Sequence, residues 1–314
     1  MRTVEESGEV GLIAMIRRWL PPGDGSVVVG SGDDCAVVRG AKVEGGKGGE
    51  EIVLKSDPVI EGRHFVRGAS AGKVGHKAVG RVLSDFAAMG AVPRWLLANL
   101  VLRPDTSVEY VRKLCHGMSR LAARFGAVIV GGDVSQGRDV AVHVFGCGTV
   151  PKGKAVLRSG ARAGDAVYVT GQLGGSLRGR HLSFTPRLAE GVFLRDYASA
   201  MMDVSDGLAS DARHLAVASG VTVALEARAI PCAPGVSLRG ALCDGEDFEL
   251  LFTVPRRRVV AFEAAWGKAF ARVAVRRIGT VAGRTHRSAP TGDGCCGVLL
   301  DGRALGLHGY DHFC

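Results

Sequence analysis

The chain mixes short apolar runs of strand length with longer amphipathic runs of helical length, and its 46 glycines punctuate these runs as turns do. Strands and helices do not alternate strictly, so the pattern predicts an α+β (mixed α/β) fold. The predicted strands are Ser26–Gly30, Ile52–Ser56, Trp95–Leu102, Ala127–Val130, Val140–Gly146, Ala166–Thr170, Val221–Leu225 and Leu250–Val254. The predicted helices are Gly72–Met89, Val108–Phe125, Gly207–Ser219 and Arg256–Phe270, and a further short amphipathic helix is expected near the first residues. We expect Arg39–Glu51 to form an exposed hairpin or loop.

The length of 314 residues suits two domains. The run GTVPKGKAV follows a predicted strand and collects breaker residues, which indicates a boundary near Val150–Lys154. We therefore expect an N-terminal domain over residues 1–150 and a C-terminal domain over residues 151–314.

Neither a membrane segment nor an exported, disulfide-rich protein is expected. No stretch approaches the roughly 18 apolar residues that a membrane helix needs, and the first residues lack the features of a signal peptide. The eight cysteines show no CxxC spacing, so we expect reduced thiols rather than a zinc site or disulfide framework. The predicted location is cytoplasmic, without a membrane partner.

The net charge of +9 is compatible with anionic substrates or with nucleic acid. The charge is spread along the chain, and its only basic run, Arg256–Arg258, is typical of a solvated helix start after Pro255. Aromatic residues make up 6% and do not interleave with basic clusters, so nucleic acid is not the expected partner. A non-catalytic, basic RNA-binding protein remains the alternative from another functional class.

Common nucleotide-binding motifs are missing. No GxxxxGK[ST] and no protein-kinase HRD and DFG set occurs. The one GxGxxG, Gly292–Gly297, follows polar residues and leads into VLLDG rather than a helix, so it is interpreted as a turn.

Aspartates stand beside Gly or Ser after several apolar runs. We expect such strand ends to converge on one edge of a sheet, where ligand sites form. Each aspartate has a simpler interpretation: Asp206 or Ser205 caps the helix at Gly207, and Asp33 and Asp133 are turn residues. The aspartates concerned are Asp33, Asp34, Asp57, Asp133, Asp203 and Asp206.

Asp85 gives the sharpest signal. On the predicted helix Gly72–Met89 it falls within the stripe formed by Val74, Ala78, Val82, Phe86 and Met89. A carboxylate facing a core costs several kcal/mol unless it is paired or bound to metal. The alternative to a metal site is a buried ion pair, with Arg81 one turn back as the candidate partner.

A carboxylate cluster suits magnesium, which takes oxygen ligands and bridges carboxylates to substrate phosphates. A reaction between two phosphorylated molecules needs several positive charges to offset their repulsion. The aspartates therefore favour phosphoryl transfer.

Eight segments resemble thiamine-monophosphate kinase in order and spacing, over nearly the whole chain. They are GDDCAVV, SDPVIEGRHF, LSDFAAMGAVP, GGDVSQG, RSGARAGDAVYVTG, DVSDGLASD, GEDFELLFTVP and the terminal GYDHF. The wider superfamily includes aminoimidazole-ribonucleotide synthetase and selenophosphate synthetase. The resemblance implies a two-domain, aminoimidazole-ribonucleotide-synthetase-like fold and a homodimer whose N-terminal sheets pair into a barrel, with ATP near the junction. It implies magnesium-dependent transfer of the ATP γ-phosphate to thiamine monophosphate, giving thiamine diphosphate and ADP.

The resemblance also implies roles for single residues. Nucleotide or phosphate contacts would come from Gly132, Asp133, Arg158 and Ser205, and the thiamine pocket would be lined by His64, Glu246 and Leu307. The interpretation of His64 without that resemblance is a hydrogen-bonded core or loop histidine. Asp133, Asp206 and Arg158 would be catalytic through charge neutralisation. The magnesium ligands would be Asp34, Ser56, Asp57, Asp85, Asp133, Asp203 and Asp206.

Three positions depart from the family's pattern. Lys55 stands where Ser or Thr is usual; a charged lysine cannot ligate a metal, but it can pair with a phosphate or with Asp57. Asp244 replaces a glycine, and Leu307 replaces an aromatic residue that often stacks on thiamine.

The expected mechanism is in-line transfer to a phosphate oxygen of thiamine monophosphate, which needs no strong general base. The nearest alternative enzyme is a selenophosphate synthetase, which resembles a chain with a reactive N-terminal Cys or its substitute. This chain has no cysteine before Cys35.

Overall fold

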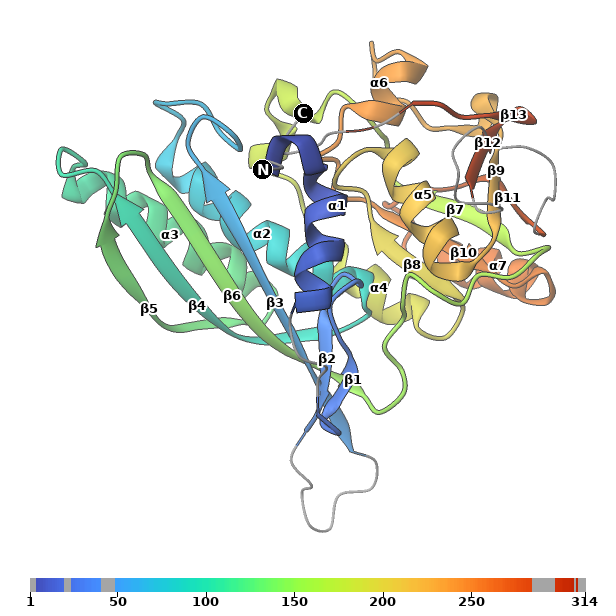
Figure 1. Ribbon diagram of the computed structural model, residues 1–314, viewed down its shortest axis with the longest axis horizontal. Helices are drawn as coiled ribbons and strands as arrows, with labels where there is room; N and C mark the ends of the chain where they lie inside the picture. The colour runs from blue at the N-terminus through green and yellow to red at the C-terminus, as the bar shows by residue number, and fades with distance from the viewer. Residues whose placement is uncertain (1–3, 20–23, 41–48, 284–296, 308, 310–314) are drawn as a thin grey trace.

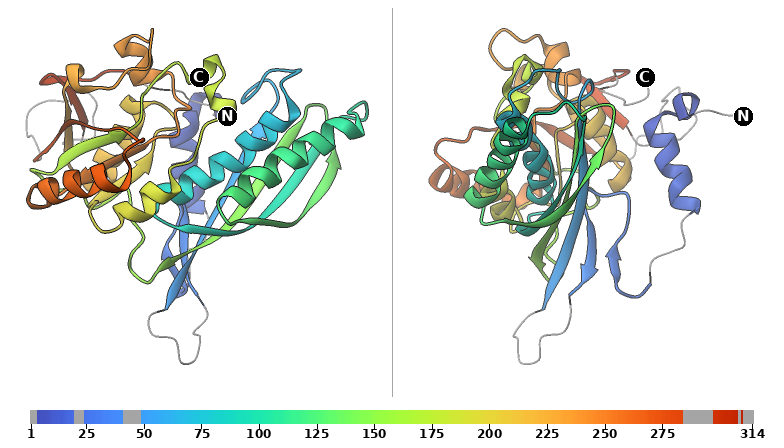
Figure 2. Two further views of the ribbon diagram at one scale, coloured as in Figure 1. Left: turned by 180° about the vertical axis from the view of Figure 1, so that it is seen from behind. Right: turned by 90° about the vertical axis from the view of Figure 1, so that its left-hand side faces the viewer.

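The computed structural model describes residues 4–19, 24–40, 49–283, 297–307 and 309. Two mixed β-sheets lie side by side, with helices packed between and around them (Figure 1). Helix α1 (Val4–Trp19) has a non-helical Gly8 and stands beside the first sheet, on the side opposite helices α2 and α3 (Figure 2).

The six-stranded sheet has the order β1-β2-β3-β6-β4-β5, and only the β4–β5 pair is parallel. Helices α2 (Ala71–Ala88) and α3 (Val108–Arg124) cover one of its faces (Figure 2). The strands are β1 Val27–Val29, β2 Ala36–Arg39, β3 Glu50–Ile60, β4 Val92–Leu102, β5 Val128–Gln136 and β6 Ala141–Pro151.

The seven-stranded sheet has the order β13-β12-β9-β11-β7-β10-β8, and only the β12–β9 pair is parallel. Its strands are β7 Ala166–Thr170, β8 Ala200–Asp203, β9 Thr222–Leu225, β10 Leu250–Val254, β11 Val275–Ala282, β12 Gly297–Leu300 and β13 Arg303–Ala304. The associated helices are α4 Leu188–Leu194, α5 Leu208–Ser219, α6 Leu238–Cys243 and α7 Val259–Ala269. Short 3₁₀ turns occupy Ser176–Arg178, Arg180–Leu182, Ala227–Ala229 and Arg256–Arg258.

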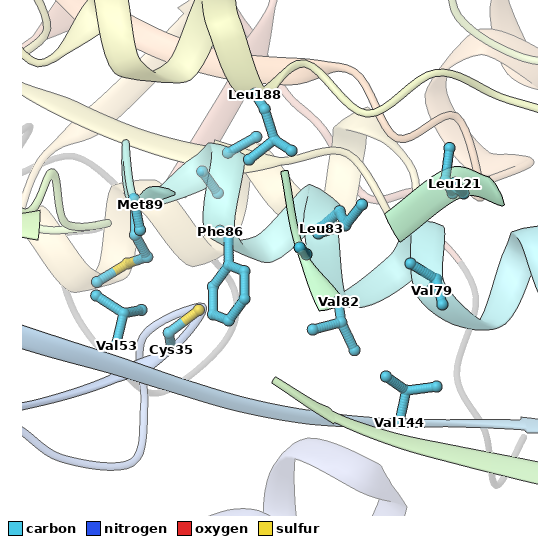
Figure 3. Close-up of a cluster of buried hydrophobic side chains, with 14 of the residues drawn as sticks. Cys35, Val53, Val79, Val82, Leu83, Phe86, Met89, Leu121, Val144 and Leu188 are labelled. Carbon is cyan, nitrogen blue, oxygen red and sulfur yellow. The ribbon is translucent and has the colours of Figure 1, made fainter. Parts of the chain in front are cut away.

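Helix α2 is buried on almost every side because it lies between the first sheet, helix α3 and the second half of the chain. Figure 3 shows Val82 directed toward Val144 of β6, and Phe86 directed toward Cys35 and Val53. One hydrophobic core continues from this helix to Tyr168, Phe252 and Trp266 beside the second sheet, and a smaller core lies around α5.

The predicted fold class is confirmed, and β7 and β10 have the predicted bounds. Strands β3 and β5 run past Asp57 and Asp133, so the prediction that these aspartates end their strands was wrong. Both aspartates interrupt an apolar run in the sequence, but the strand continues beyond each of them. The sequence prediction missed β2, β8, β11, β12, β13, α4 and α6, most of which are too short to show a clear period.

Strand β6 ends at Pro151, next to the predicted boundary, but the shared core crosses it, so the division at residue 150 stays a prediction. Arg256–Arg258 are exposed before α7, as the solvated-helix-start interpretation predicts. The Gly292–Gly297 turn lies outside the described residues except for Gly297, and most of the predicted Arg39–Glu51 loop does too.

Among the described residues, no helix has both the length and the apolarity to cross a membrane. Cysteines 35, 115, 147, 232 and 243 are free thiols, and the cytoplasmic location stays a prediction.

Candidate functional site

A cleft of about 750 Å³ opens where helix α2, strand β3 and the segments around β8 and α5 meet. Residues far apart in the sequence contribute to it, from Glu9 and Ile13 of α1 to Gly309 near the end of the chain. Its charged lining consists of Glu9, Asp33, Lys55, Asp57, Arg81, Asp85, Arg158, Asp203, Asp206, Asp211, Arg213 and His214.

Three buried carboxylates converge beside this cleft, and two of them, Asp85 and Asp203, line it. One oxygen from each of Asp34, Asp85 and Asp203 lies within 4.8 Å of the others. Asp34 precedes β2, Asp85 lies in the last turns of α2, and Asp203 ends β8, so three separate segments build the cluster. The convergence predicted for the aspartates at strand ends is therefore present for Asp34 and Asp203, and Asp85 of helix α2 joins them.

Two cations offset the neighbouring carboxylates. Nζ of Lys55 lies 3.0 Å from Oδ1 of Asp85 and 3.6 Å from Oδ2 of Asp57, because alternate residues of β3 face α2. Arg81 lies 3.5 Å from Asp57 and 3.7 Å from Glu246. The predicted Lys55–Asp57 pair is confirmed. The candidate pairing of Asp85 with Arg81 was wrong, since Asp85 pairs with Lys55 and Arg81 is directed to Asp57 and Glu246.

Arg158 is held by the loop that precedes β2. Its Nε and Nη2 donate to Oδ1 of Asp34 at 3.1 and 2.5 Å, and its backbone N–H donates to Asp33 at 3.2 Å. Both contacts leave Oδ2 of Asp34, which is buried, without a hydrogen-bond partner among the described residues. The Arg158 side chain is 23% exposed and lines the cleft.

Burial dominates the electrostatics of the cluster. Burial and the nearby Asp34 carboxylate raise the pKa of Asp203 to about 7, although the Ser84 hydroxyl opposes the shift. Burial also raises the pKa of Asp85, with added repulsion from Asp57 and Asp203. For Asp57, Lys55 and Arg81 together outweigh the effect of burial, and its pKa is lowered.

The DVSDGL segment forms the loop between β8 and α5. Ser205 and Asp206 line the cleft, and the N-cap of α5 is Gly207, so neither of them takes the capping position. The backbone N–H of Asp206 donates to Oδ2 of Asp211, at 3.2 Å. Asp211 is completely buried on the first turn of α5 and also lines the cleft.

A second charged group lies beside the cleft and contains two of the predicted thiamine contacts. Lys77, which is fully buried, pairs with Glu246 and donates a 2.7 Å hydrogen bond to the carbonyl of His64. His64 is buried, and its Nδ1 accepts from the backbone N–H of Ile60 at 3.0 Å. Burial lowers the pKa of Lys77 to about 8 despite the Glu246 carboxylate. Arg81 joins this group to the carboxylate cluster, as it reaches both Glu246 and Asp57.

Three predicted site residues on the six-stranded sheet lie outside the cleft: Ser56, Gly132 and Asp133. Ser56 is exposed between the inward-facing Lys55 and Asp57. Asp133 is exposed on β5 and pairs in register with the exposed Asn99 of β4. Within one chain, Ser56 and Asp133 therefore do not join the carboxylates of the cleft.

Gly132, beside Asp133, has a packing role that the sequence did not indicate. A Cβ at this position would lie 1.9 Å from the carbonyl oxygen of Ala98, so a side chain is excluded by the close approach of β4.

Leu307 is half-buried and packs against the smaller core, and it does not line the described cleft. Gly309, two residues later, does line the cleft, and its backbone N–H donates to Ser210 at 2.7 Å. The rest of the GYDHF tail lies outside the described residues.

Sequence reasoning missed Lys77 and Asp211. Lys77, Arg81 and Asp85 follow one another at i, i+4 and i+8 on α2, so helical spacing was the available signal. The sequence analysis also missed the two ion pairs that hold the GEDFEL segment in place. Asp247 pairs with Arg180, and Glu249 pairs with Arg187 through two hydrogen bonds. These contacts fix the loop after β7 against β10.

The fold and the family comparison define a class of proteins. Residues 32–150 match the family described as AIR synthase related protein, N-terminal domain. A structure of the hydrogenase maturation protein HypE from Escherichia coli shares the fold, at 22% identity and a TM-score of 0.65 over 81% of this chain and 85% of that one. The chain therefore contains an AIR-synthase-related N-terminal domain at residues 32–150.

Closer relatives narrow this class. The thiamine-monophosphate kinases of Aquifex aeolicus and Escherichia coli are each 32% identical to the chain, with 99% and 98% of both sequences covered. A solved structure described as AaThiL complexed with AMPPCP and TMP is 32% identical, with a TM-score of 0.82 and 99% of both chains covered. The chain belongs to the thiamine-monophosphate kinase family.

Proposed function

We propose that the chain transfers the γ-phosphate of ATP to thiamine monophosphate, giving thiamine diphosphate and ADP. The observation that carries the proposal is the convergence of Asp34, Asp85 and Asp203, two of which, Asp85 and Asp203, line the cleft. Full-length similarity to kinases of that name, and to a structure whose description includes AMPPCP and TMP, supports the choice of substrates.

Magnesium fits this donor set. The cluster offers only carboxylate oxygens, the ligands that magnesium prefers. Oδ2 of Asp34 is buried with no hydrogen-bond partner in the described part of the chain, and such an atom is costly unless a cation satisfies it. Asp34, Asp85 and Asp203 would hold magnesium, with Asp57 and Asp206 beside them. Bound magnesium would supply positive charge against the phosphates of both substrates.

The chain's own residues position the phosphates. Arg158 lies at the cleft with its guanidinium fixed by Asp34, an arrangement suited to forked hydrogen bonds with phosphate oxygens. Ser205 lines the same cleft and is proposed to contact the nucleotide phosphates. The acceptor is a phosphate oxygen that is already ionised at neutral pH, so no strong general base is required. Catalysis then consists of orientation and charge neutralisation.

The thiamine end of the acceptor is proposed to bind near Glu246 and His64. Glu246 carries a negative charge beside the cleft and suits the cationic thiazolium ring, while Lys77 connects it to His64. Leu307 would be a weaker apolar contact than an aromatic ring, consistent with its place in the core rather than at the cleft.

A homodimer through the six-stranded sheet is part of the proposal. The face opposite α2 and α3 exposes large apolar side chains, including Trp95, Leu97 and Phe145. Apolar surface of this kind usually marks an interface. Ser56 and Asp133 lie on the same sheet outside the cleft, so they contribute to nucleotide or metal binding only when ATP binds at the junction of two chains. The same geometry gives Gly132 its proposed place near the nucleotide.

The test is direct. Purified protein is incubated with ATP, magnesium and thiamine monophosphate, and thiamine diphosphate is measured by chromatography. We expect product from the wild-type chain, none from Asp206→Asn or Asp133→Asn, and normal turnover from the exposed control Asp196→Asn. A folded wild-type protein that binds ATP and forms no thiamine diphosphate contradicts the proposed substrate. Wild-type turnover by Asp206→Asn or by Asp133→Asn contradicts the catalytic role proposed for that residue.

A further inference from the structure

The ammonium group of Lys55 lies among the carboxylates of the proposed magnesium site, where only anionic or neutral ligands would be expected. Nζ of Lys55 is 3.0 Å from Oδ1 of Asp85 and 3.6 Å from Oδ2 of Asp57, and both carboxylates belong to the proposed magnesium site. Strand β3 fixes this placement, because Lys55 and Asp57 are alternate residues and both face α2. Lys55 is 23% exposed, and its long side chain ends among the acids rather than in solvent.

We propose that the Lys55 ammonium is a built-in cation of the carboxylate cluster and occupies the place of one divalent ion. The inference rests on the proposed magnesium role of the cluster and is independent of the acceptor substrate.

Geometry provides the first step. An ammonium group donates hydrogen bonds and has no lone pair for a metal. Magnesium lies about 2.1 Å from an oxygen ligand. An ion bound at Oδ1 of Asp85 would therefore lie within a few ångströms of Nζ of Lys55, and two cations at that separation repel strongly inside a buried site. Lys55 and a magnesium ion compete for this oxygen.

Charge balance provides the second step. Asp34, Asp57, Asp85 and Asp203 gather at one end of the cleft, and three cations already face them: Arg158 pairs with Asp34, Arg81 with Asp57, and Lys55 with Asp85. Asp203 pairs with none of these three and accepts from Ser84. The free oxygen of Asp34 and the carboxylate of Asp203, with the second oxygen of Asp85, form the part of the cluster that remains open to a divalent ion.

Substitution of Lys55 by a neutral residue removes the cation that pairs with Asp85 and one of the two cations beside Asp57, which keeps Arg81. Lys55→Thr supplies a hydroxyl oxygen there, which suits magnesium. Lys55→Gln is a second neutral variant of similar length, in case the threonine variant folds poorly. Lys55→Arg retains the charge. Lys73→Thr is the matched control, because Lys73 is an exposed residue on the same helix as Asp85.

The experiment counts bound Mn²⁺ per chain by electron paramagnetic resonance of the free ion. It is run at saturating AMPPCP, with folding of each variant verified by thermal melting in EDTA. We expect Lys55→Thr and Lys55→Gln to bind about one Mn²⁺ more than the wild type. Lys55→Arg and Lys73→Thr should match the wild-type count.

Equal counts in the wild type and in either folded neutral variant overturn the inference, since Lys55 then does not exclude an ion. Absence of Mn²⁺ binding in all proteins overturns both the inference and the proposed metal site. An increased count in a protein that does not phosphorylate thiamine monophosphate supports the role of Lys55 and removes only the proposed acceptor.

Discussion

The hydroxyl of Ser84, on helix α2, donates a 2.6 Å hydrogen bond to Oδ2 of Asp203, at the end of strand β8. Both side chains are buried. The bond joins the segment LSDFAAMG to the segment MMDVSDG across 119 residues of sequence. It therefore couples the position of a proposed metal ligand to the packing of the central helix.

Ser84→Ala removes this donor and leaves Oδ2 of Asp203 without its hydroxyl partner. The cost of an unsatisfied buried acceptor predicts a loss of about 1–3 kcal/mol in the free energy of unfolding. Loss of the bond also raises the pKa of Asp203 further, so magnesium binding should weaken. Urea denaturation and calorimetric titration with magnesium measure the two effects. The exposed Ser119→Ala is the control, and equal behaviour of the two variants would show that the bond has no energetic role.

Asp203→Asn should separate stability from activity. Burial and Asp34 raise the pKa of Asp203 from 3.8 to about 7 in the metal-free protein. Between these values the folded chain binds more protons than the unfolded chain, so this residue lowers stability as pH rises toward 7. The neutral asparagine avoids that loss. We expect the variant in EDTA to match the wild type near pH 4 and to gain roughly 1 kcal/mol or more at pH 7.5, where the wild-type carboxylate is charged.

The same variant should form no thiamine diphosphate, because an amide is a poorer ligand for magnesium than a carboxylate. Urea denaturation at several pH values and the product assay check the two halves. A variant less stable than the wild type at pH 7.5 in EDTA would contradict the loss of stability that we assign to the charged Asp203 carboxylate in the metal-free protein.

The sequence predicted the long elements because their apolar periods extend over several turns or residues. Helix α2 is an example, and the same period placed Asp85 in the core, where the structure has it. Short, fully buried strands such as β8 carry too few residues to show a period, so only the aspartate at its end was noticed. The strand ends predicted at Asp57 and Asp133 were also wrong, because a polar residue inside a strand has the same sequence pattern as a strand end.

The site was predictable as a set of acids, but only one of its ion pairs, Lys55 with Asp57, was predicted. Asp34, Asp85 and Asp203 met as expected, yet nothing in the sequence indicates that Lys55 is directed to Asp85 while Arg81 is directed to Asp57 and Glu246. That choice depends on which residues of β3 face α2, a property of strand register. The contact of Lys77 with Glu246 spans 169 residues and is set by tertiary packing alone.

Lys77→Met should raise the KM for thiamine monophosphate several-fold with little change in the KM for ATP. The lysine holds Glu246 and the backbone of His64, two proposed thiamine contacts, and it does not line the cleft where the phosphates are proposed to bind. Steady-state kinetics at pH 7 with each substrate varied in turn separates the two constants. The exposed Lys73→Met is the control for the substitution itself. An equal rise in both KM values would indicate general disruption of α2 instead.

The KM of the wild-type enzyme for thiamine monophosphate should change with pH as Lys77 loses its proton. Burial lowers the pKa of Lys77 from 10.5 to about 8, so the charge that pairs with Glu246 is lost as pH rises through about 8. The KM for thiamine monophosphate should then increase between pH 7 and 9.5, and this increase should be absent in Lys77→Met. The unfolded chain keeps its proton longer, so this group adds stability as pH rises from about 8 toward 10.5. A KM that is flat across this range in the wild type would exclude the lysine as the titrating group.

A charge placed on the exposed face of the six-stranded sheet should disrupt the proposed dimer. Trp95 is 54% exposed and Phe145 is 38% exposed, and large aromatic side chains commonly provide most of the binding energy of an interface. We expect Trp95→Glu and Phe145→Glu to convert a dimeric wild-type protein to monomers in light scattering coupled to size exclusion. Val108→Glu is the matched control, because Val108 is 85% exposed at the start of α3, away from that face.

Since Ser56 and Asp133 lie on the same sheet outside the cleft, the monomeric variants should also lose turnover while their far-ultraviolet circular dichroism stays unchanged. A wild-type chain that is monomeric at micromolar concentration and fully active would remove both the dimer and the junction role of Asp133.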